Sequence, residues 1–335
     1  MIADMIRSAG PDGDERRITS FVYQVREVVG ELERNGLELD RSDSGSLKLT
    51  SAGGMSEPRV ATSGDRIGGP VMKVLIRELR NSQCTIRPNC RVRAIHRLRD
   101  GLSVETDTEV LRARSVVVAT GGTSYRESRR TSSATSNPSN ENHHLYDMLS
   151  LSLGVQAERH YQFQPFGDVA SIDSSHVAQL VPESVVSLDV QLLDRNGKAV
   201  VDVRAGRLVV SQAIWEAERN NRTVEASNGR QGLLLTLSGI DPGVLEARFP
   251  TLYQKLVASD RVGTDLVVAP VLHYELGGLV AGSSGRTAVE GLYIAGEMVG
   301  GLHGANRLMG NGLTESLVSG WRTGREVVDY VNGVA

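Results

Sequence analysis

The chain has 335 residues, of which 40% are hydrophobic, and its formal net charge is −3 at pH 7. A chain of this length can bury a large core and is expected to form two subdomains, since single cores stop growing near about 250–300 residues. The slightly negative charge argues against a nucleic-acid partner, because nucleic-acid-binding proteins present basic surfaces.

Cysteine content and hydropathy bear on the cell compartment. Cys84 and Cys90 are the only cysteines, too few for a disulfide framework or a four-thiolate metal site. No apolar run approaches the roughly 18 residues of a membrane-spanning helix, and Met1 is not followed by a signal-peptide pattern. These features predict a cytoplasmic chain with no transmembrane segment. Peripheral attachment to a membrane through a partner stays open.

The first third of the chain predicts two helices followed by short strands. Apolar residues at helical spacing predict a helix over 18–32 that ends near Asn35. A second helix is expected to begin at Gly69 or Pro70, because proline suits a first helical turn. The β-segments expected next are Thr85–Ile86, Arg91–Leu98, Leu102–Glu105 and Ser115–Ala119.

The last of these β-segments leads into a pair of glycines. Its residues are fully apolar, which suits the middle of a parallel sheet with a ligand at the carboxyl end of the strand. The four residues at that end are therefore candidates for binding a cofactor. They are Ala119, Thr120, Gly121 and Gly122.

The middle of the chain reads as a second region inserted into the first. Residues 123–144 are rich in Ser, Thr, Asn and Arg and predict a loop, after which helical periodicity resumes over 145–153. Further on, the pattern predicts a strand over 185–193, a turn at 194–197 and a helix over 208–219.

The stretch from Gly291 to Glu315 carries most of the functional signal. Its short apolar run at 292–295 predicts a buried strand, and Glu297 follows among several glycines that let a ligand approach the backbone. Asn311 is predicted to cap a helix over 313–328, whose first turn presents free N–H groups and a partial positive charge. This arrangement predicts a binding site.

The same stretch resembles the C-terminal FAD-binding signature of the succinate dehydrogenase and fumarate reductase flavoprotein family, which also includes L-aspartate oxidase. The matching segments are Ala-Gly-Glu at 295–297, Gly-Gly-Leu-His-Gly-Ala-Asn-Arg at 300–307 and Gly-Asn-Gly-Leu at 310–313. The resemblance implies an FAD cofactor, with its ribityl chain held by Glu297 and its flavin O2 edge held by the backbone of Gly312 and Leu313. Asn306 is implied as a further cofactor contact, and Arg307 as a ligand of a substrate carboxylate.

Two other segments extend the resemblance to the chemistry. Residues 205–214 resemble the family segment whose arginine gives or takes a proton, which implies that role for Arg207. Residues 270–278 resemble the segment of a carboxylate-binding histidine, which implies that role for His273. By themselves, Arg207 reads as a surface arginine at a helix N-terminus and His273 as a core histidine. Arginine suits carboxylates because its planar fork binds them through two hydrogen bonds.

Several positions depart from the family pattern on the substrate side. Gln164 stands where the family has a carboxylate-binding histidine, so it can donate an N–H but carries no charge. Glu183 matches a family glutamate of the proton relay and is the second candidate catalytic residue, while Val186 replaces the arginine of that relay. These departures leave open whether the substrate is a bulkier or a different carboxylate.

A metal site is not expected. Adjacent histidines at 143 and 144 lie in a polar loop, and adjacent side chains of this kind point apart.

The sequence contains no G-x-G-x-x-G turn after an apolar strand, the element whose helix N-terminus holds the FAD pyrophosphate. We therefore expect an α/β fold with an incomplete Rossmann-like FAD-binding domain, its opening βαβ unit absent, over 1–160 and 275–335. An inserted α+β substrate-capping domain is expected over 161–274.

The expected function is that of an FAD-dependent oxidoreductase of the fumarate reductase and succinate dehydrogenase type. It would transfer a hydride between flavin N5 and a carbon–carbon bond of a small carboxylate. One alternative is a truncated or non-catalytic flavoprotein-like subunit, with a partner chain that supplies the pyrophosphate site or transfers electrons. An activity like that of L-aspartate oxidase is the third reading.

Overall fold

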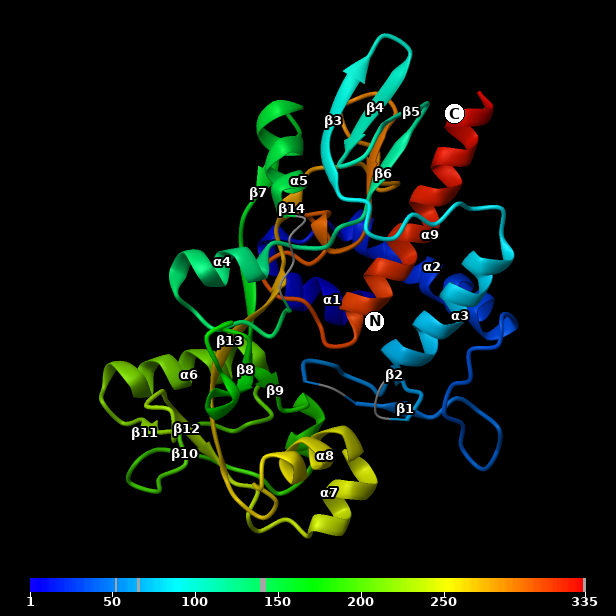
Figure 1. Cartoon of the computed structure of the whole chain (residues 1–335). Coiled ribbons are helices and arrows are strands. Elements are labelled where there is room, and N and C mark those ends of the chain that lie inside the picture. The colour runs from blue at the N-terminus through cyan, green and yellow to red at the C-terminus, as the bar shows by residue number, and fades with distance from the viewer. Residues whose placement is uncertain (52, 65–66, 139–142, 334–335) are drawn as a thin grey trace.

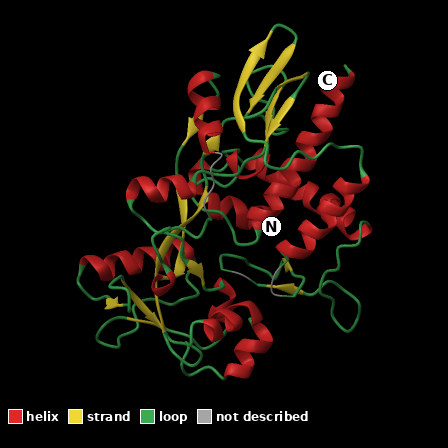
Figure 2. Cartoon of the chain, in the orientation of Figure 1, coloured by secondary structure: helices red, strands yellow, loops and turns green. Residues whose placement is uncertain are grey.

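A computed structural model describes residues 1–51, 53–64, 67–138 and 143–333 of the chain. Its strands form separate small groups between the helices rather than one continuous sheet (Figure 2). The C-terminal helix runs diagonally from the upper right of Figure 1 to the centre of the molecule, and the chain begins beside its lower end.

Four helices form the wall of the upper half on the side of the C-terminal helix. Asp14 caps one of them by accepting hydrogen bonds from the N–H groups of Arg16 and Arg17, which explains why this helix begins before residue 18. Apolar side chains of this helix pack against the C-terminal helix in a core that includes Phe21 and Val318. The helices are α1 (Ile2–Ala9), α2 (Glu15–Arg34), α3 (Gly68–Asn81) and α9 (Asn311–Asn332).

Two strand groups complete this half of the molecule. One is an antiparallel sheet in the order β3, β4, β5, and the other is a parallel pair. The pair joins segments far apart in the sequence, because Val118 lies opposite Ile294. The predicted parallel pairing of the apolar strand near residue 117 is thus confirmed, whereas its predicted place in the middle of a sheet is wrong, because among the described residues it has one partner strand. The strands are β3 (Val92–Leu98), β4 (Gly101–Thr106), β5 (Val110–Ala113), β6 (Val116–Val118) and β15 (Leu292–Ile294).

The lower half of the molecule in Figure 1 holds a six-stranded antiparallel sheet. Its order is β10, β12, β13, β8, β9, with β11 beside β12, and its apolar face packs with three helices around Ile214 and Leu235. The strands are β8 (Tyr161–Asp168), β9 (Gln179–Leu180), β10 (Leu192–Leu193), β11 (Val224–Glu225), β12 (Gln231–Leu235) and β13 (Leu266–Glu275). The helices are α6 (Arg207–Arg219), α7 (Pro242–Arg248) and α8 (Pro250–Ala258).

The remaining strands and helices are short. Two strand pairs lie outside the larger sheets, and two short helices precede the six-stranded sheet in sequence. The strands are β1 (Leu49–Thr50), β2 (Val60–Ala61), β7 (Ala157–Glu158) and β14 (Gly278–Leu279); the helices are α4 (Ser124–Thr131) and α5 (His143–Asp147). None of the helices in the described ranges combines the length and hydropathy that a bilayer crossing needs.

Three local predictions are wrong. The polar stretch after residue 122 contains α4, since the helix buries Ser124 and Ser128 and leaves its charged residues outside. Residues 85–86 form no strand. Only Leu192–Leu193 of the expected strand over 185–193 is a strand. Its first three residues end a 3-10 helix at Glu183–Ser187, and Val185 and Leu188 pack together in the core of the six-stranded sheet.

The predicted cap of the C-terminal helix is also wrong. Gly310 occupies the N-cap position with a φ of 82°, in the left-handed region where a glycine is favoured. Asn311 is instead the first helical residue.

Candidate active site

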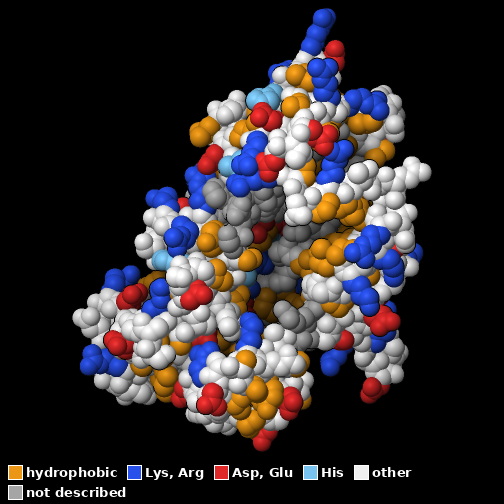
Figure 3. Space-filling view, viewed as in Figure 1, with side chains coloured by type: hydrophobic (Ala, Val, Ile, Leu, Met, Phe, Trp, Pro, Cys, Tyr) orange, Lys and Arg blue, Asp and Glu red, His pale blue; other side chains and the backbone are white. Residues whose placement is uncertain are grey.

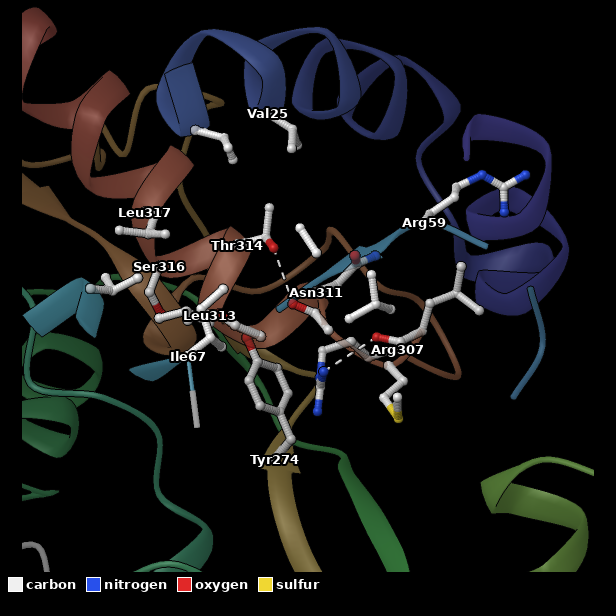
Figure 4. Close-up of a pocket in the computed structure, with 18 of the residues that line it drawn as sticks. Val25, Arg59, Ile67, Tyr274, Arg307, Asn311, Leu313, Thr314, Ser316 and Leu317 are labelled. Atoms are coloured by element: carbon white, nitrogen blue, oxygen red, sulfur yellow. Dashed lines mark hydrogen bonds between the residues drawn. The ribbon is translucent and has the colours of Figure 1, made fainter. Parts of the chain in front are cut away.

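A pocket of about 510 Å³ lies between α2, α3, α9 and the end of β13. Figure 3 shows this face of the molecule hollowed near its centre, with hydrophobic side chains along the rim. One wall of the pocket is apolar and the other end is charged (Figure 4). The apolar wall includes Val25, Val29, Leu32, Val71, Leu313 and Leu317; the charged end consists of Arg207, Glu297 and Arg307 with the imidazole of His273.

Arg307 is the most deeply buried cation of the pocket. Its guanidinium carbon lies 4.3 Å from the centre of the Tyr274 ring, and its Nη1 donates to the backbone oxygen of Leu308 at 3.3 Å. Its Nε has no hydrogen-bond partner among the described residues. Burial and the positive charge of Arg207 lower the pKa of Arg307 to about 10. The side chain stays protonated at neutral pH and keeps donors available to an anion.

Arg207 approaches the same site from the first turn of α6. Its Nε donates to Glu183 Oε2 at 2.6 Å, and its Nη1 donates to Gln162 Oε1 at 3.1 Å. The amide nitrogen of Gln162 in turn donates to the Asn306 side chain at 2.5 Å and to the backbone oxygen of Arg307 at 3.0 Å. Gln162 therefore joins the two arginine-bearing segments, one from each half of the molecule.

His273 lies near the end of β13 and faces the pocket as a neutral imidazole. Its Nδ1 is 2.7 Å from the Ser136 hydroxyl, and its backbone oxygen accepts from Asn137. Burial, together with the charges of Arg307 and Arg207, lowers the pKa of His273 to about 3. At neutral pH it can donate or accept a hydrogen bond but contributes no charge.

Glu297 follows β15 and lies over the glycine pair after β6. Its Oε1 accepts from the backbone N–H of Glu275 at 3.0 Å. A Cβ added to Gly122 would lie 2.4 Å from the same oxygen, so glycine is required there for this close approach. Burial raises the pKa of Glu297 to about 7, and the nearby charge of Glu275 adds to the effect. The carboxyl group lines the pocket and can exchange hydrogen bonds with hydroxyl groups.

The first turn of α9 lines the pocket beside Glu297. Backbone N–H groups at Gly312 and Leu313 belong to the turn that has no intrahelical acceptors, and the helix dipole makes this end positive. The Nδ2 of Asn311 is buried without a partner among the described residues. These donors suit a carbonyl or an anionic ring edge.

The residues of the pocket fit the ring and ribityl portion of FAD. An isoalloxazine ring needs an apolar slot and donors for its O2 edge, and the ribityl chain needs a hydroxyl acceptor. The apolar wall, the first turn of α9 and Glu297 meet these needs in that order. The cofactor would supply the hydride chemistry at flavin N5.

The structure brings most of the predicted site residues together. Arg207, His273, Arg307 and Glu297 line one pocket with Gly312 and Leu313, and Glu183 contacts Arg207. Ala119, Thr120, Gly121 and Gly122 form the loop after β6, where Gly122 meets Glu297.

The four residues of the loop after β6 do not themselves line the pocket, and two further predicted residues lie elsewhere. Gln164 is buried, its Oε1 has no partner in the part of the chain that the structure describes, and it does not line the pocket. The side chain of Asn306 accepts a hydrogen bond from Gln162 and donates one to Ser8, and it does not line the pocket.

Sequence reasoning missed Gln162, Tyr274, His303 and Glu315 as parts of the site. Gln162 lies two residues before Gln164 on β8, and both side chains are buried. Which of them reaches Arg207 depends on how α6 packs against β8, and no sequence pattern reports that packing. Tyr274 follows His273 in the sequence, and this adjacency to a predicted site residue was the one feature that could have indicated it.

The described residues contain no group of three His, Cys, Asp or Glu side chains placed to hold a metal ion. His144 Nε2 lies 2.8 Å from the backbone oxygen of Val92. The side chain of His143 and the neighbouring Asn142 lie outside the described residues.

The fold and the pocket define a protein class. A parallel strand pair with a glycine loop at its carboxyl end and a helix N-terminus at a pocket are features of a protein that binds a nucleotide cofactor.

The comparisons with known proteins identify the family. A sequence profile for the FAD binding domain matches residues 1–313. The chain belongs to this family, in the group of succinate dehydrogenase, fumarate reductase and L-aspartate oxidase flavoproteins, and FAD is its cofactor.

Relatives and solved structures show how far the similarity extends. An L-aspartate oxidase from Halalkalibacterium halodurans is 30% identical over 94% of this chain and 59% of its own length. A fumarate reductase (CoM/CoB) chain from Methanothermobacter marburgensis is 29% identical over 96% of this chain and 60% of its own. The flavoprotein chain of an E. coli quinol fumarate reductase superposes with a TM-score of 0.87 at 23% identity, over 100% of this chain and 60% of that one. The chain thus spans about three fifths of the length of these proteins.

Proposed function

We propose that the chain is the catalytic part of an FAD-dependent oxidoreductase of the fumarate reductase and succinate dehydrogenase type. It transfers a hydride between flavin N5 and a carbon–carbon bond of a small carboxylate. The observation that carries this proposal is the pair of buried arginines at one end of the pocket. Arg207 is paired with Glu183, whereas Arg307 forms no ion pair within the described part of the chain. A buried cation that makes no direct ion pair is costly, and an anionic substrate in contact with it would reduce that cost.

The side chains divide the work of holding and protonating such a substrate. Arg307 binds a carboxylate through its fork, and His273 donates a hydrogen bond to the same group or to a second carboxylate. Arg207 delivers or removes the proton on the substrate carbon, and Glu183 exchanges that proton with Arg207 Nε across their 2.6 Å hydrogen bond. The neutral Gln162 holds Arg207 Nη1 without adding a second negative charge to it.

The domain organisation follows from the same contacts. We infer that residues 1–160 and 275–335 form an incomplete Rossmann-like FAD-binding domain, of which β6 and β15 are a parallel strand pair. Residues 161–274 form the substrate-capping domain, supported by the separate core around the six-stranded sheet. Arg207 comes from the capping domain and Glu297 from the FAD-binding domain, so the pocket is completed only when the two meet.

An electron-transfer partner and a cytoplasmic location, with peripheral attachment to a membrane, belong to the same proposal. The support for a partner chain is that a chain of the same fold belongs to a Mycobacterium smegmatis Sdh1 complex, with which this chain superposes at a TM-score of 0.79 and 24% identity.

The test is a titration of the flavin-loaded protein with succinate, fumarate and L-aspartate while the flavin absorbance is followed. We expect a saturable spectral change with a dicarboxylate. Arg307→Lys should weaken the affinity by roughly 10- to 150-fold, the equivalent of about 1.5–3 kcal/mol for a hydrogen bond to a charged group. Arg325→Lys is the matched control, because Arg325 is exposed on α9 and does not line the pocket. No spectral change with any of the three compounds would refute the proposal.

A second candidate is the oxidation of L-aspartate. Several of the relatives that resemble the chain are L-aspartate oxidases, including those at 29–30% identity from Halalkalibacterium halodurans and Streptomyces coelicolor. Anaerobic bleaching of the flavin by L-aspartate but not by succinate would favour this candidate. The opposite result would favour the dehydrogenase and reductase chemistry.

A further inference from the structure

The buried Arg307 is held in place by an aromatic ring rather than by a carboxylate. The ring of Tyr274 lies 4.3 Å from the guanidinium carbon, a distance typical of a cation–π contact. Figure 4 shows the two side chains beside each other at one end of the pocket. Within the described ranges, the only hydrogen bond of the guanidinium group is the 3.3 Å contact to the backbone oxygen of Leu308. Its orientation therefore depends on how firmly the ring of Tyr274 is fixed.

The tyrosine ring is itself fixed from behind. The Tyr274 hydroxyl donates a short hydrogen bond to Glu315 Oε2, and His303 Nε2 lies 3.0 Å from the same oxygen. The rings of Tyr274 and His303 meet edge to face with centroids 5.8 Å apart. Three separate segments thus converge, namely the end of β13, the loop before α9 and the second turn of α9.

Tyr274, Glu315 and His303 are all buried, and most of this cluster lies away from the pocket. The exposed fractions of Tyr274, Glu315 and His303 are 6%, 4% and 3%. Of the three, only Tyr274 lines the pocket, so Glu315 and His303 do not contact a ligand there. A Cβ on Gly312 would lie 3.2 Å from the Tyr274 ring and 3.3 Å from Arg307 Nη1, so the helix backbone closes over the ring and the guanidinium together.

The position of the carboxylate has a chemical consequence. A glutamate in direct contact with Arg307 would occupy the donors that a substrate carboxylate needs. Glu315 is instead hydrogen-bonded to the far end of the tyrosine, so it provides negative charge near Arg307 while the guanidinium fork stays free. The negative charge of Glu315 offsets part of the repulsion between Arg307 and the neighbouring Arg207.

We propose that Tyr274, Glu315 and His303 are a positioning unit that fixes the guanidinium of Arg307 and balances its charge without occupying its donors. The proposal deepens the function proposed above and rests on it for the identity of the carboxylate ligand. Tyr274 orients Arg307, Glu315 orients Tyr274 and supplies the charge, and His303 holds Glu315.

The first test observes Arg307 directly and needs no substrate. The Arg307 Nε–H resonance of the ¹⁵N-labelled, FAD-loaded protein is assigned by its loss in Arg307→Lys. We expect a sharp, slowly exchanging signal in the parent protein, and a broadened or absent signal in Tyr274→Phe and Glu315→Gln. The matched control is Tyr293→Phe, which removes a buried tyrosine hydroxyl that has no hydrogen-bond partner among the described residues. An unchanged signal in both variants would overturn the proposal.

The second test separates the charge of Glu315 from its structural role. Succinate affinity of the FAD-loaded protein is measured by calorimetry from pH 7 to 10.5. Tyr274→Phe should raise the Kd roughly 3- to 10-fold at all pH values, since it removes one hydrogen bond and keeps the ring. Glu315→Gln should also move the alkaline loss of affinity to lower pH, by on the order of one unit, because less negative charge remains to keep Arg307 protonated.

The two tests distinguish failure of the positioning unit from failure of the proposed dicarboxylate function. If the parent protein binds no succinate but its Arg307 signal is lost in both variants, the positioning unit stands and the dicarboxylate function fails. If the parent binds succinate and Glu315→Gln leaves the alkaline limb in place, Glu315 does not balance the charge and the proposal fails. Glu326→Gln is the control for charge removal, since Glu326 lies further along the same helix and outside the pocket.

Discussion

At the scale of single residues, His273 and Arg307 line the same pocket in different charge states. Burial and the positive charge of neighbouring arginine lower the pKa of both groups, but only that of the histidine falls below the neutral range. A substrate carboxylate thus meets one fixed cation in Arg307 and one neutral donor in His273. Arg307 therefore supplies the charge that attracts the carboxylate, and His273 supplies a hydrogen bond that orients it.

The lowered pKa of His273 predicts how the folded protein responds to acid. The unfolded chain binds a proton at this residue near pH 6.5, whereas the folded chain does so only near pH 3. Between these values the unfolded state holds more protons, so stability rises with pH and is lost as the pH falls below about 6.5.

We expect His273→Asn to reduce the slope of the unfolding free energy against pH by about 1.4 kcal/mol per pH unit between pH 4 and 6, because the variant lacks the one proton that the unfolded parent binds at this residue. Urea unfolding at several pH values measures the slope. His96→Asn is the control, because His96 is exposed on β3. Equal slopes for the parent and His273→Asn would contradict the buried neutral imidazole.

At the scale of elements, the glycine loop after β6 and the 3-10 turn after β15 meet at one contact. Glu297 is held between the Glu275 N–H and the backbone of Gly122, so the two parallel strands fix its carboxyl group at their carboxyl ends. The position of this group depends on the absence of a side chain at residue 122.

Gly122→Ala should therefore weaken FAD binding while it leaves the fold intact. The added Cβ would lie 2.4 Å from Glu297 Oε1 and 2.8 Å from its Cδ, which forces the carboxyl group out of the pocket wall. We expect at least a tenfold rise in the Kd of FAD, about 1.4 kcal/mol, measured by the quenching of flavin fluorescence. Unchanged FAD affinity with an unchanged far-ultraviolet spectrum would argue against Glu297 as a cofactor contact.

The C-terminal helix α9 offers a prediction about stability alone. Gly320 and Gly324 lie on exposed positions inside this helix, and nothing would lie within 4 Å of a Cβ at either residue. Gly320→Ala and Gly324→Ala should each stabilise the protein by roughly 0.5–1 kcal/mol, because alanine loses less backbone entropy in a helix. Thermal unfolding measures this gain. Gly285→Ala should do the reverse, since its Cβ would lie 2.3 Å from the backbone oxygen of Ile294 at a positive φ.

At the scale of the whole molecule, the site lies where two separate cores meet. The core of the six-stranded sheet includes Ile214 and Leu235, and the core beside α9 includes Phe21 and Val318. The chain of hydrogen bonds from Arg207 through Gln162 to the backbone of Arg307 crosses between them. A ligand in the pocket contacts residues from both sides.

Binding in this pocket should therefore stabilise both cores together. At a free FAD concentration of 100 times the Kd, mass action adds about 2.7 kcal/mol to the stability. We expect calorimetry to show the whole unfolding transition moving to higher temperature, with a further rise when succinate is added. Movement of only part of a divided transition would show that FAD contacts one core alone.

The sequence by itself determined the elements with strong periodicity and the residues with the most distinctive chemistry. The helices near residues 18–32 and 208–219, the buried strand at 292–294 and the parallel partner at 116–118 follow from local hydrophobic patterns. The roles predicted for Arg207, His273, Arg307 and Glu297 came from the family signature, and these residues share one pocket.

Only the tertiary structure decided which neighbours these residues have. Gln162 rather than Gln164 reaches Arg207 because of where α6 packs along β8, a tertiary contact that the pattern of one strand does not contain. The contact of Tyr274 with Glu315 joins segments 41 residues apart. Burial beside Arg207 and Arg307 sets the charge state of His273, since a pKa depends on surroundings that the chain acquires only when it folds.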